Sequence, residues 1–521
     1  MSSIPKSPLS YWVETAPGPH FAHLQGDLEV DVAIVGGGIT GITAALLLQR
    51  AGKRVAVLEG RRVGQGVTGY TTAHLTEAID ARYATIERDF GLEGAKLAAD
   101  ASRSAIARIA RFVAEEKIDC AFRTLPGYLY SEDESDIELL HAEFEAAKRA
   151  GLRVEMTREI PLPFATAAAI RFEGQAELHS LDYLFPLCQR FIAAGGMIFE
   201  NAQVLDVVDG EPCAIHTEAG TVRAADVIVA ANAPINRLFL QTKIAHYRSY
   251  VIAVRVAEPR LEGLFWDTDD PYHYLRGVTS TRHGGNVVLV GGEDHKTGIE
   301  TDTDDCYERL LAYTRLRFHV EEVGFRWSAQ VIEPVDGLPF IGRNSLSTHV
   351  YVATGYSGNG MTFGTAAAMM LADEVLGRQN AWSELFAATR VKPLAAAKDY
   401  VTENVDFPLH LVGDRIRPAE AKSLEEVGRG EGKIANVDGT RLAVYRDDAG
   451  VVHALSPVCP HLGCHVHFNS AERSWDCPCH GSRFKPTGEV INGPSTRGLE
   501  VRTVDDDRGD EPDLLLVDPS V

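Results

Sequence analysis

Two short segments near the C-terminus place thiols and imidazoles close together in the chain. Residues 459–464 read CPHLGC and residues 477–482 read CPCHGS, so these segments hold four of the eight cysteines. Pro and Gly favour turns, and each segment is therefore predicted to form a loop. Thiolates and imidazoles together suit zinc or an iron–sulfur cluster. In a reducing compartment this clustering predicts a metal site before a disulfide scaffold, and the ligand types leave both metals open.

A glycine-rich segment near the N-terminus has the composition of a phosphate-binding turn. Residues 30–35 (VDVAIV) form an apolar, β-branched run that is typical of a strand buried on both faces. They lead into GGGITG at 36–41, a helix-forming run at 42–49, a second strand at 55–58 and then Glu59. This order of strand, turn, helix, strand and acid predicts a dinucleotide-binding unit.

Each position of this motif has a physical role. Gly36 makes the tight turn, Gly38 lets the backbone approach a pyrophosphate, and Gly41 allows the helix to pack closely on the strand. Free N–H groups at the helix N-terminus bind phosphate, and Glu59 lies where a carboxylate accepts hydrogen bonds from ribose hydroxyls. The motif alone does not separate NAD from FAD.

A second glycine-rich turn lies at residues 350–361, which read VYVATGYSGNGM. Residues 350–353 are predicted to form a buried strand, and the glycines after it permit a backbone that follows a planar ring. The Ala- and Met-rich run 362–376 predicts a helix. Its N-terminus suits the pyrimidine edge of a flavin, where negative charge develops on reduction. Taken alone, the pattern fits an ordinary strand–turn–helix crossover equally well.

Together these segments resemble the D-amino-acid oxidase superfamily, which includes glycine and sarcosine oxidases. The matching stretches are 64–69 (GQGVTG), 181–232 with a strand expected to end near Val204, 336–342 (DGLPFIG) and 350–361. The resemblance spans 31–377 and implies a Rossmann-like FAD-binding domain with a mixed-sheet substrate domain. The residues implied to contact FAD are Gly36, Gly38, Gly41, Glu59, Gly66, Thr68, Val204, Gly355, Tyr356, Gly358, Gly360 and Met361.

The electron donor implied by this resemblance is a small amine or amino acid. No second GxGxxG follows the first hundred or so residues, which disfavours NADH as the donor. In the superfamily such substrates are oxidised to an imine, which water hydrolyses. Residues 271–276 (PYHYLR) occupy the place of substrate-facing residues, which assigns Arg276 to a substrate carboxylate and Tyr274 to the pocket wall. An exposed Arg and a core Tyr form the structural alternative.

The spacing of Cys and His in the C-terminal loops resembles that of Rieske proteins. The resemblance implies a [2Fe–2S] cluster in which Cys459 and Cys477 bind one iron and His461 and His480 bind the other. Because neutral imidazoles replace two thiolates, such a cluster is easier to reduce than an all-cysteine one, at about −150 to +300 mV.

Other positions of the two loops also match the Rieske pattern. Cys464 and Cys479 match a pair that forms a disulfide in one Rieske subgroup, an exception to the rarity of disulfides in the cytoplasm. Ser482 matches a hydroxyl that bonds a bridging sulfide and raises the potential. Phe484 stands where high-potential members carry Tyr, so the top of the range is not expected.

The chain has 521 residues, too many for a single hydrophobic core. We expect an N-terminal segment at 1–27, an FAD-dependent oxidoreductase of α/β and α+β class at 28–390, a linker at 391–425 and a small all-β Rieske domain at 426–521. The β-prone runs of this last domain lie at 442–445, 451–455, 499–504 and 514–517.

The composition excludes several classes of partner. Lys and Arg total 51 against 73 for Asp and Glu, and the net charge of −22 disfavours nucleic-acid binding. No apolar run approaches the length of a transmembrane helix, and residues 1–19 lack the pattern of a secretory signal. We therefore expect a cytoplasmic enzyme with no nucleic-acid partner and no membrane span.

The two predicted cofactors suggest an electron path. The leading hypothesis is a dehydrogenase in which FAD takes a hydride from the substrate and electrons pass singly to the [2Fe–2S] cluster. They then reach an external one-electron acceptor protein or a quinone. The alternatives are an O2-using amine oxidase with a structural Rieske domain, and a redox-responsive binding protein. A Rieske oxygenase is disfavoured because no mononuclear iron ligand set is evident upstream.

Overall fold

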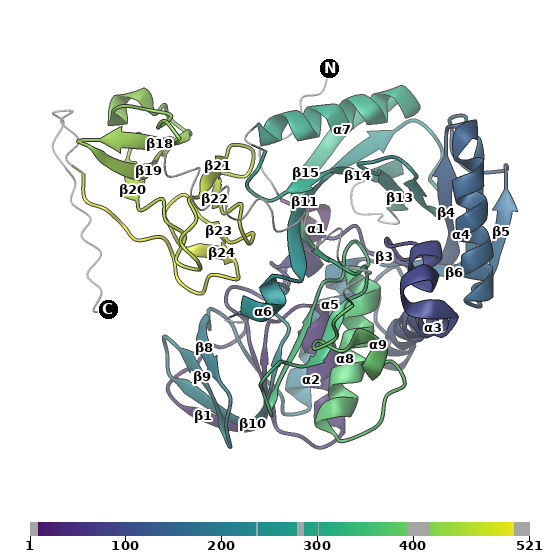
Figure 1. The fold of residues 1–521 in the computed structure, drawn as a ribbon, viewed down its shortest axis with the longest axis horizontal. Coiled ribbons are helices and arrows are strands. Elements are labelled where there is room, and N and C mark those ends of the chain that lie inside the picture. Colours follow the sequence, from purple (N-terminus) through teal and green to yellow (C-terminus); the bar gives the residue numbers. More distant parts are fainter. Residues whose placement is uncertain (1–8, 236–237, 279–285, 301, 393–416, 505–521) are drawn as a thin grey trace.

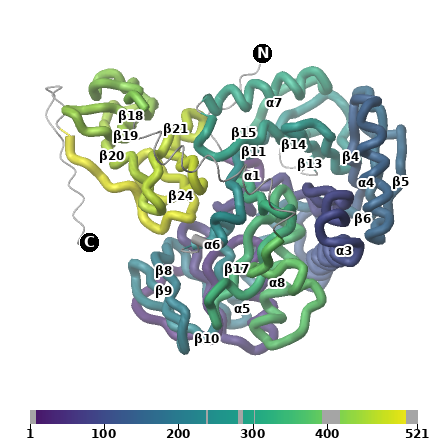
Figure 2. Tube along the Cα trace, viewed as in Figure 1, coloured from purple at the N-terminus to yellow at the C-terminus, as the bar shows by residue number. Residues whose placement is uncertain are grey.

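The computed structural model describes residues 9–235, 238–278, 286–300, 302–392 and 417–504. Figure 1 shows two bodies, a larger main unit built from 9–392 and a smaller C-terminal unit built from 417–504. In Figure 2 the part of the C-terminal unit labelled β21 and β24 faces the main unit. The middle of the predicted linker, 393–416, and the predicted β-prone run 514–517 lie outside the described residues.

One sheet of the main unit has the parallel arrangement expected of a dinucleotide-binding unit. Its order is β16-β17-β10-β1-β2-β7, with β16 antiparallel and the other five strands parallel, and the hairpin β8–β9 is bonded to β10. The bounds are β1 Leu28–Val35, β2 Val55–Leu58, β7 Met197–Phe199, β8 Val204–Val208, β9 Cys213–Thr217, β10 Thr221–Val229, β16 Phe340–Arg343 and β17 Val350–Thr354.

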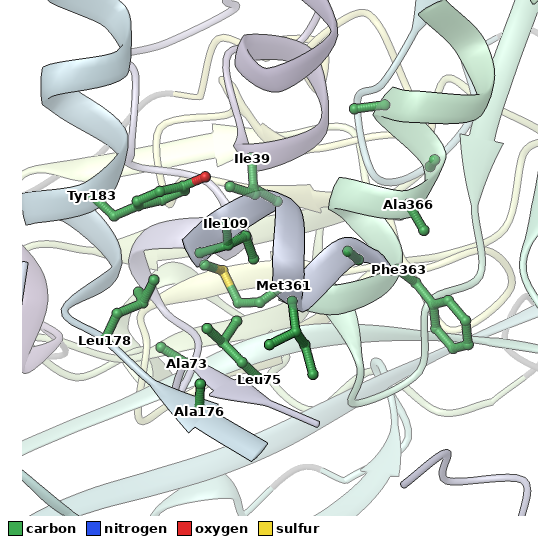
Figure 3. Packing of buried hydrophobic residues seen from close by; sticks show 14 of the residues in the cluster. Ile39, Ala73, Leu75, Ile109, Ala176, Leu178, Tyr183, Met361, Phe363 and Ala366 are labelled. Carbon is green, nitrogen blue, oxygen red and sulfur yellow. The ribbon is translucent and has the colours of Figure 1, made fainter. Parts of the chain in front are cut away.

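Side chains alternate between the two faces of this sheet and build two cores. Val32 and Ile34 of β1 pack with helices α2 (Ile39–Arg50), α5 (Ser180–Ala193) and α8 (Gly360–Val375). Figure 3 shows how α2, α3 (Tyr83–Glu116), α5 and α8 bring apolar side chains to one place, next to β3 and β6 of the second sheet. Because this core joins both sheets, the main unit packs as one body.

The strand predicted to end near Val204 is a point of correction. The strand ends at Phe199, and Val204 is instead the first residue of β8. Between them Asn201 adopts a left-handed conformation (φ 51°), and the amides of Asn201 and Ala202 donate to the carbonyls of Arg61 and Glu59. These bonds turn the chain back to the end of β2, which a run of β-prone residues does not reveal.

The second sheet is mixed, as expected for a substrate domain. Its order is β15-β11-β14-β13-β12-β4-β6-β3 with β5 beside β6, and only the pair β12–β4 is parallel. The bounds are β3 His74–Leu75, β4 Arg123–Ser131, β5 Val154–Thr157, β6 Ala168–Glu177, β11 Ile244–Val256, β12 Leu264–Asp267, β13 Tyr274–Val278, β14 Asn286–Lys296 and β15 Val320–Pro334.

The C-terminal unit consists of two small antiparallel sheets, β18-β19-β20 and β21-β22-β23-β24. Their bounds are β18 Gly432–Val437, β19 Thr440–Arg446, β20 Val452–Leu455, β21 His467–Asn469, β22 Ser474–Asp476, β23 Arg483–Phe484 and β24 Val490–Asn492. Two predicted runs coincide with β19 and β20, whereas 499–504 makes only an isolated bridge from Val501 to Leu455. Residues 421–427, partly in the predicted linker, pack on the first sheet.

The remaining helices pack on strands of the two main sheets or lie in loops, and η3 belongs to the C-terminal unit. Their bounds are α1 Tyr11–Thr15, η1 Val67–Gly69, η2 Glu134–Asp136, α4 Ile137–Arg149, α6 Leu238–Gln241, α7 Thr303–Arg317, α9 Ser383–Phe386 and η3 Leu424–Glu426. Tyr11 and Trp12 of α1 are buried, so this helix of the N-terminal segment belongs to the core. Within the described ranges, no helix has both the length and the apolar character needed to traverse a bilayer.

Candidate functional site

Two glycines at the start of α2 are required by close backbone contacts. Gly36 has a φ of +108°, and a Cβ there would lie 2.5 Å from the carbonyl oxygen of Ala230. A Cβ on Gly41 would lie 1.9 Å from the carbonyl oxygen of Gly36. Because no side chain fits at either position, α2 packs directly against β1, and its N-terminus borders a cavity through Gly38.

Hydrogen bonds hold the rim of this cavity in place. The Glu59 carboxylate at the end of β2 accepts from the amides of Gly37 (2.8 Å) and Arg61 (3.0 Å). The Thr68 hydroxyl accepts from the Ile39 amide at 3.0 Å and so satisfies a donor at the helix N-terminus. The glycine-rich loop 64–69 is thereby fixed against the start of α2.

The second predicted motif reaches the same cavity from the other side. Tyr356 and Thr40 join the two motifs through their hydroxyls, which lie 3.2 Å apart. Gly355 has a φ of +79° and makes the turn after β17. Gly358 points away from the cavity lining, and its amide donates to the carboxylate of Asp80.

The cavity between these motifs brings most of the predicted FAD-contacting residues together. A Cβ at Gly66 or Gly360 would meet no atom within 4 Å, so these parts of the wall are bare backbone open to a ligand. Gly41, Gly355 and Gly358 shape the surrounding backbone without lining the cavity. The predicted residues that line it are Gly36, Gly38, Glu59, Gly66, Thr68, Val204, Tyr356, Gly360 and Met361.

The far wall of the cavity comes from residues that the sequence did not single out. Gln330 and Ile332 of β15 line it, and so do Val490, Ile491, Asn492, Gly493 and Ser495 of the C-terminal unit. In Figure 1, β24 accordingly lies on the side of the C-terminal unit that faces β11 and α6. No local pattern marks these positions, because they meet only when the two units dock.

The Cys–His loops, defined as residues 459–464 and 477–482, have matching geometry. In each loop the first cysteine amide donates to the carbonyl five residues later, from Cys459 to Cys464 and from Cys477 to Ser482, both at 2.8 Å. Cys459 and Cys477 are buried, and the rings of His461 and His480 lie 4.9 Å apart between centroids. The four predicted ligands therefore converge on one place.

The protonation of His461, His480 and Cys459 suits a metal cluster, whereas the hydrogen bond to Cys459 and burial raise the pKa of Cys477, whose proton metal binding must release. Burial lowers the pKa of His461 to about 4, and burial together with His461 lowers the pKa of His480 to about 4. The hydrogen bond from Cys477, aided by backbone amides and Ser482, lowers the pKa of Cys459. His461 Nε2 is buried and makes no hydrogen bond to the described residues. Neutral imidazoles and thiolates are the forms that bind metal.

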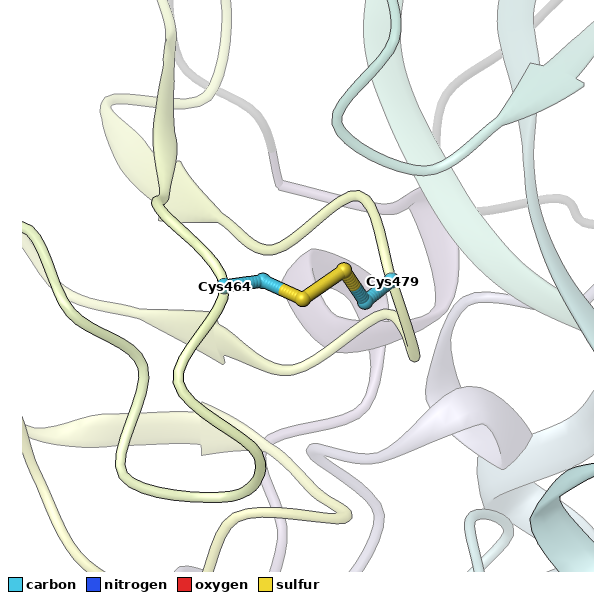
Figure 4. Close-up of a disulfide and its surroundings, with 2 residues drawn as sticks. All are labelled: Cys464 and Cys479. Carbon is cyan, nitrogen blue, oxygen red and sulfur yellow. A yellow bond between two sulfur atoms is a disulfide. The ribbon is translucent and has the colours of Figure 1, made fainter. Parts of the chain in front are cut away.

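A disulfide joins the two Cys–His loops. Figure 4 shows Cys464 and Cys479 linked across the loops, with their Cα atoms 6.5 Å apart. Cys479 directly precedes the predicted ligand His480 in the chain. The bond therefore ties together the two segments that carry the ligands.

A buried network of charges docks the C-terminal unit on the main unit. Arg248 of β11 forms an ion pair with Glu472 at 2.7 Å, and Arg483 bonds both Glu472 and Asp476, the latter at 2.9 Å. All four side chains are at least nine-tenths buried. Burial opposes ionisation of Glu472, but the two guanidiniums outweigh it and lower the pKa of this carboxyl. The alternating charges leave the interface without an uncompensated carboxylate.

The two residues predicted to contact substrate have different surroundings. Arg276 is buried, and its Nη1 donates to the carbonyls of Thr72, Ala73 and Leu178 at 2.8–3.2 Å. Its Nε lies 3.4 Å from Glu177. These partners occupy the guanidinium, so the contacts favour a structural role for Arg276, although the side chain is buried and not exposed as the structural alternative had it.

Tyr274 belongs to a polar cluster beside the turn at Gly358. Its hydroxyl lies 2.8 Å from that of Ser249, and its ring lies 5.7 Å from Tyr272 between centroids. Asp294 lies in this cluster with both carboxylate oxygens buried and without a hydrogen bond of normal geometry to the described residues. Burial, with the nearby charge of Asp80, raises the pKa of Asp294 to about 7. No motif in the sequence singles out Asp294, Asp80 or Tyr272, because they meet only through the fold of the second sheet.

Comparison with protein families decides the identity of the main unit. A family model described as FAD dependent oxidoreductase matches residues 31–374, more than half of the chain. The chain belongs to the FAD dependent oxidoreductase family. A second model, described as Rieske [2Fe-2S] domain, matches residues 418–504. This FAD-dependent oxidoreductase therefore carries a C-terminal Rieske domain.

Individual relatives agree with both assignments. The Rieske 2Fe-2S iron-sulfur protein YhfW of Bacillus subtilis (strain 168) is 33% identical over 499 residues, covering 95% of this chain and 97% of YhfW. Gamma-glutamylputrescine oxidoreductase of Escherichia coli (strain K12) is 25% identical, covering 68% of this chain and 86% of the relative. The glycine oxidase structure from Geobacillus kaustophilus superposes with a TM-score of 0.61 at 22% identity, covering 70% of this chain and 99% of that one.

The oxidoreductase therefore uses FAD and a [2Fe–2S] cluster, as the sequence predicted. The glycine-lined cavity suits the flavin cofactor, because bare backbone and a helix N-terminus face it. The buried cysteines and neutral histidines of the two loops are the donor set of a Rieske cluster. The predicted disulfide pair is also present in the structure.

Proposed function

We propose that this oxidoreductase is a dehydrogenase that oxidises a small amine or amino acid and exports the electrons through its Rieske domain. FAD supplies the hydride acceptor for the carbon next to nitrogen, which leaves an imine that water hydrolyses. Electrons then pass one at a time to the [2Fe–2S] cluster, because it carries a single electron. An external one-electron acceptor, a protein or a quinone, takes two electrons per turnover, and two protons pass to solvent.

The observation that carries this proposal is the composite wall of the FAD cavity. Residues 490–493 and Ser495 of the Rieske domain line the cavity together with Gly38 and Met361 of the oxidoreductase motifs. The Ser495 amide in turn donates to the Ser482 hydroxyl at 3.0 Å, within the second Cys–His loop. A short stretch of one domain therefore borders both cofactor sites.

Among substrates, the surroundings of Tyr274 favour an amine. Asp294 and Asp80 place carboxyl groups near this tyrosine, whereas the guanidinium of Arg276 is occupied by protein carbonyls. Carboxyl groups accept hydrogen bonds from the N–H groups of an amine, while a substrate carboxylate finds no available guanidinium at Arg276. The similarity to gamma-glutamylputrescine oxidoreductase supports the same class of substrate.

The proposal is tested anaerobically with the purified holoenzyme. Candidate amines and amino acids are mixed with the protein, flavin bleaching is followed by absorption, and cluster reduction by electron paramagnetic resonance. The expected result is bleaching followed by the signal of a reduced Rieske cluster. A flavin that stays reduced beside an oxidised cluster would contradict internal transfer.

Two alternatives predict different outcomes of related experiments. A plain amine oxidase releases stoichiometric hydrogen peroxide even when His461 and His480 are replaced by Ala. A redox-responsive binding protein turns over no amine and binds its partner in one oxidation state only.

A further inference from the structure

The side chain of Gln330 connects the FAD cavity with the second Cys–His loop. Gln330 lies on β15, is 2% exposed and lines the cavity. Its Nε2 donates to the Gly481 carbonyl at 2.8 Å, although the two residues are 151 positions apart in the chain. Gly481 directly follows the predicted iron ligand His480. One amide therefore reaches from the flavin site to the backbone that holds a ligand.

The hydrogen-bond partners of Gln330 Nε2 fix which way the side-chain amide points. The Gln330 Nε2 lies 3.3 Å from His246 Nδ1, and His246 Nε2 lies 3.2 Å from the Gln241 side-chain oxygen. The Gln330 nitrogen only donates and the Gln241 side-chain oxygen only accepts, so the ring tautomer that satisfies both contacts carries its proton on Nε2. His246 Nδ1 is then an acceptor. The two acceptors, Gly481 and His246, thus use both hydrogens of the Gln330 NH2 group.

Among the described residues, the oxygen of the same amide has no partner. Gln330 Oε1 is buried and makes no hydrogen bond to the described residues. A buried acceptor without a donor destabilises the folded protein unless a ligand supplies the donor. Since Gln330 lines the FAD cavity, bound FAD can supply this donor through its ribityl hydroxyls or its ring N–H.

Close packing keeps the loop at Gly481 in this position. Gly481 has a φ of +65°, and a Cβ there would lie 2.5 Å from His246 Cβ and 2.6 Å from Gln330 Nε2. Only glycine therefore lets the second Cys–His loop approach β11 and β15 so closely.

We propose that Gln330 is a positioning residue that bridges the two cofactors: its Oε1 accepts a hydrogen bond from bound FAD while its Nε2 holds the Cys–His loop at Gly481. This inference rests on the proposed function, because it assigns the contact through which electrons leave the flavin site. The bridge sets the distance and the orientation of the cluster loop relative to the flavin. The two electrons of each turnover cross it in succession.

Three variants separate the two ends of the bridge. Gln330→Leu removes both ends, whereas Gln330→Glu keeps an acceptor for FAD and loses the donor to Gly481 and His246. Gln175→Leu is the matched control, because Gln175 is also a buried glutamine of the second sheet but is not among the residues that line the FAD cavity, and its side-chain oxygen accepts from the Glu77 amide. Iron content, FAD content and the unfolding temperature establish that each purified variant is folded and loaded.

The measurements are FAD affinity, the absorption spectrum of bound flavin, and the rate of cluster reduction after the flavin is reduced by light in the absence of substrate. Gln330→Leu is expected to weaken FAD about fivefold, to shift the flavin spectrum and to slow cluster reduction about tenfold. Gln330→Glu is expected to slow cluster reduction with near-normal FAD affinity. Gln175→Leu is expected to leave the FAD affinity, the flavin spectrum and the transfer rate unchanged.

The outcomes distinguish this inference from the proposed function. If cluster reduction is absent in the unsubstituted enzyme, the proposed function fails, while the FAD affinity and spectrum of Gln330→Leu still test the flavin contact. If transfer occurs and both Gln330 variants match the unsubstituted enzyme in rate, affinity and spectrum, the bridge is overturned.

Discussion

Single residues near the two cofactor sites have their chemistry set by burial. Asp294 is the clearest case, because its carboxylate oxygens are buried, no described residue makes a hydrogen bond of normal geometry to them, and burial raises its pKa from 3.8 to about 7. The folded protein therefore retains a proton that the unfolded chain releases between about pH 4 and pH 7. The free energy of unfolding falls as pH rises through this window.

Replacing Asp294 by Asn removes this loss. Compared with the unsubstituted protein, Asp294→Asn is expected to gain about 2–4 kcal/mol of stability between pH 4 and pH 8, because Asn has no ionised form to desolvate. Denaturant unfolding at several pH values measures the difference. A difference that stays constant with pH would show that Asp294 ionises normally in the folded state.

Ser482 is a second single residue whose hydrogen bonds are predicted to set a property of the site, the reduction potential of the [2Fe–2S] cluster. Its hydroxyl bonds Cys459, which contributes to the lowered pKa of that thiol, and its oxygen accepts from the Ser495 amide. Donors to ligand sulfur stabilise the more negative reduced cluster. Ser482→Ala is therefore expected to lower the midpoint potential by about 40–90 mV, which corresponds to one hydrogen bond of about 1–2 kcal/mol. A redox titration followed by paramagnetic resonance measures the change.

The control for this measurement is Ser470→Ala, in the exposed turn after β21. This variant is expected to leave the midpoint potential unchanged. An equal shift in both variants would mean that Ser482 has no special influence on the cluster.

At the scale of elements, the contact between α2 and β1 decides whether the FAD site forms. Gly41→Ala places a methyl group 1.9 Å from the Gly36 carbonyl, so the helix must move away from the strand. We expect a loss of about 2 kcal/mol or more in stability, together with loss of bound FAD. Thermal unfolding and the ratio of flavin to protein absorption measure both effects.

Gly324→Ala in β15 provides the comparison, because its nearest neighbour is the Ala253 carbonyl at 3.7 Å. Its stability is expected to change by about 0.5 kcal/mol or less, with full FAD content. If Gly41→Ala retained FAD equally well, close packing of α2 would not be what forms the site.

At the scale of the whole molecule, the buried charge network determines how the Rieske domain is held. Glu472→Gln leaves Arg248 and Arg483 without their shared carboxylate, which is expected to cost about 3–5 kcal/mol of docking free energy. Calorimetry should then resolve separate unfolding of the Rieske domain. Glu321→Gln, which breaks the exposed pair with Arg255, is expected to change stability by about 1 kcal/mol or less. A single cooperative transition in Glu472→Gln would show that other contacts suffice.

The amino-acid sequence by itself determined both cofactors and the architecture of each domain. The GGGITG turn, Glu59 and the spacing of Cys459, His461, Cys477 and His480 are local patterns, because the backbone geometry that each site needs is formed by consecutive residues. Even the disulfide partners lie only 15 positions apart. For such features, spacing along the chain is close to spacing in space.

Tertiary structure alone decided how the two sites are joined. The decisive contacts join segments that are far apart in sequence. Gln330 bonds the carbonyl of Gly481, Ser495 lines the FAD cavity, and Arg276 donates to backbone carbonyls. A polar residue on a strand looks the same in the sequence whether it faces a substrate, a cofactor or a carbonyl. Only the packing of the two sheets and the docking of the Rieske domain choose among these, because each contact depends on which surfaces are brought together on folding.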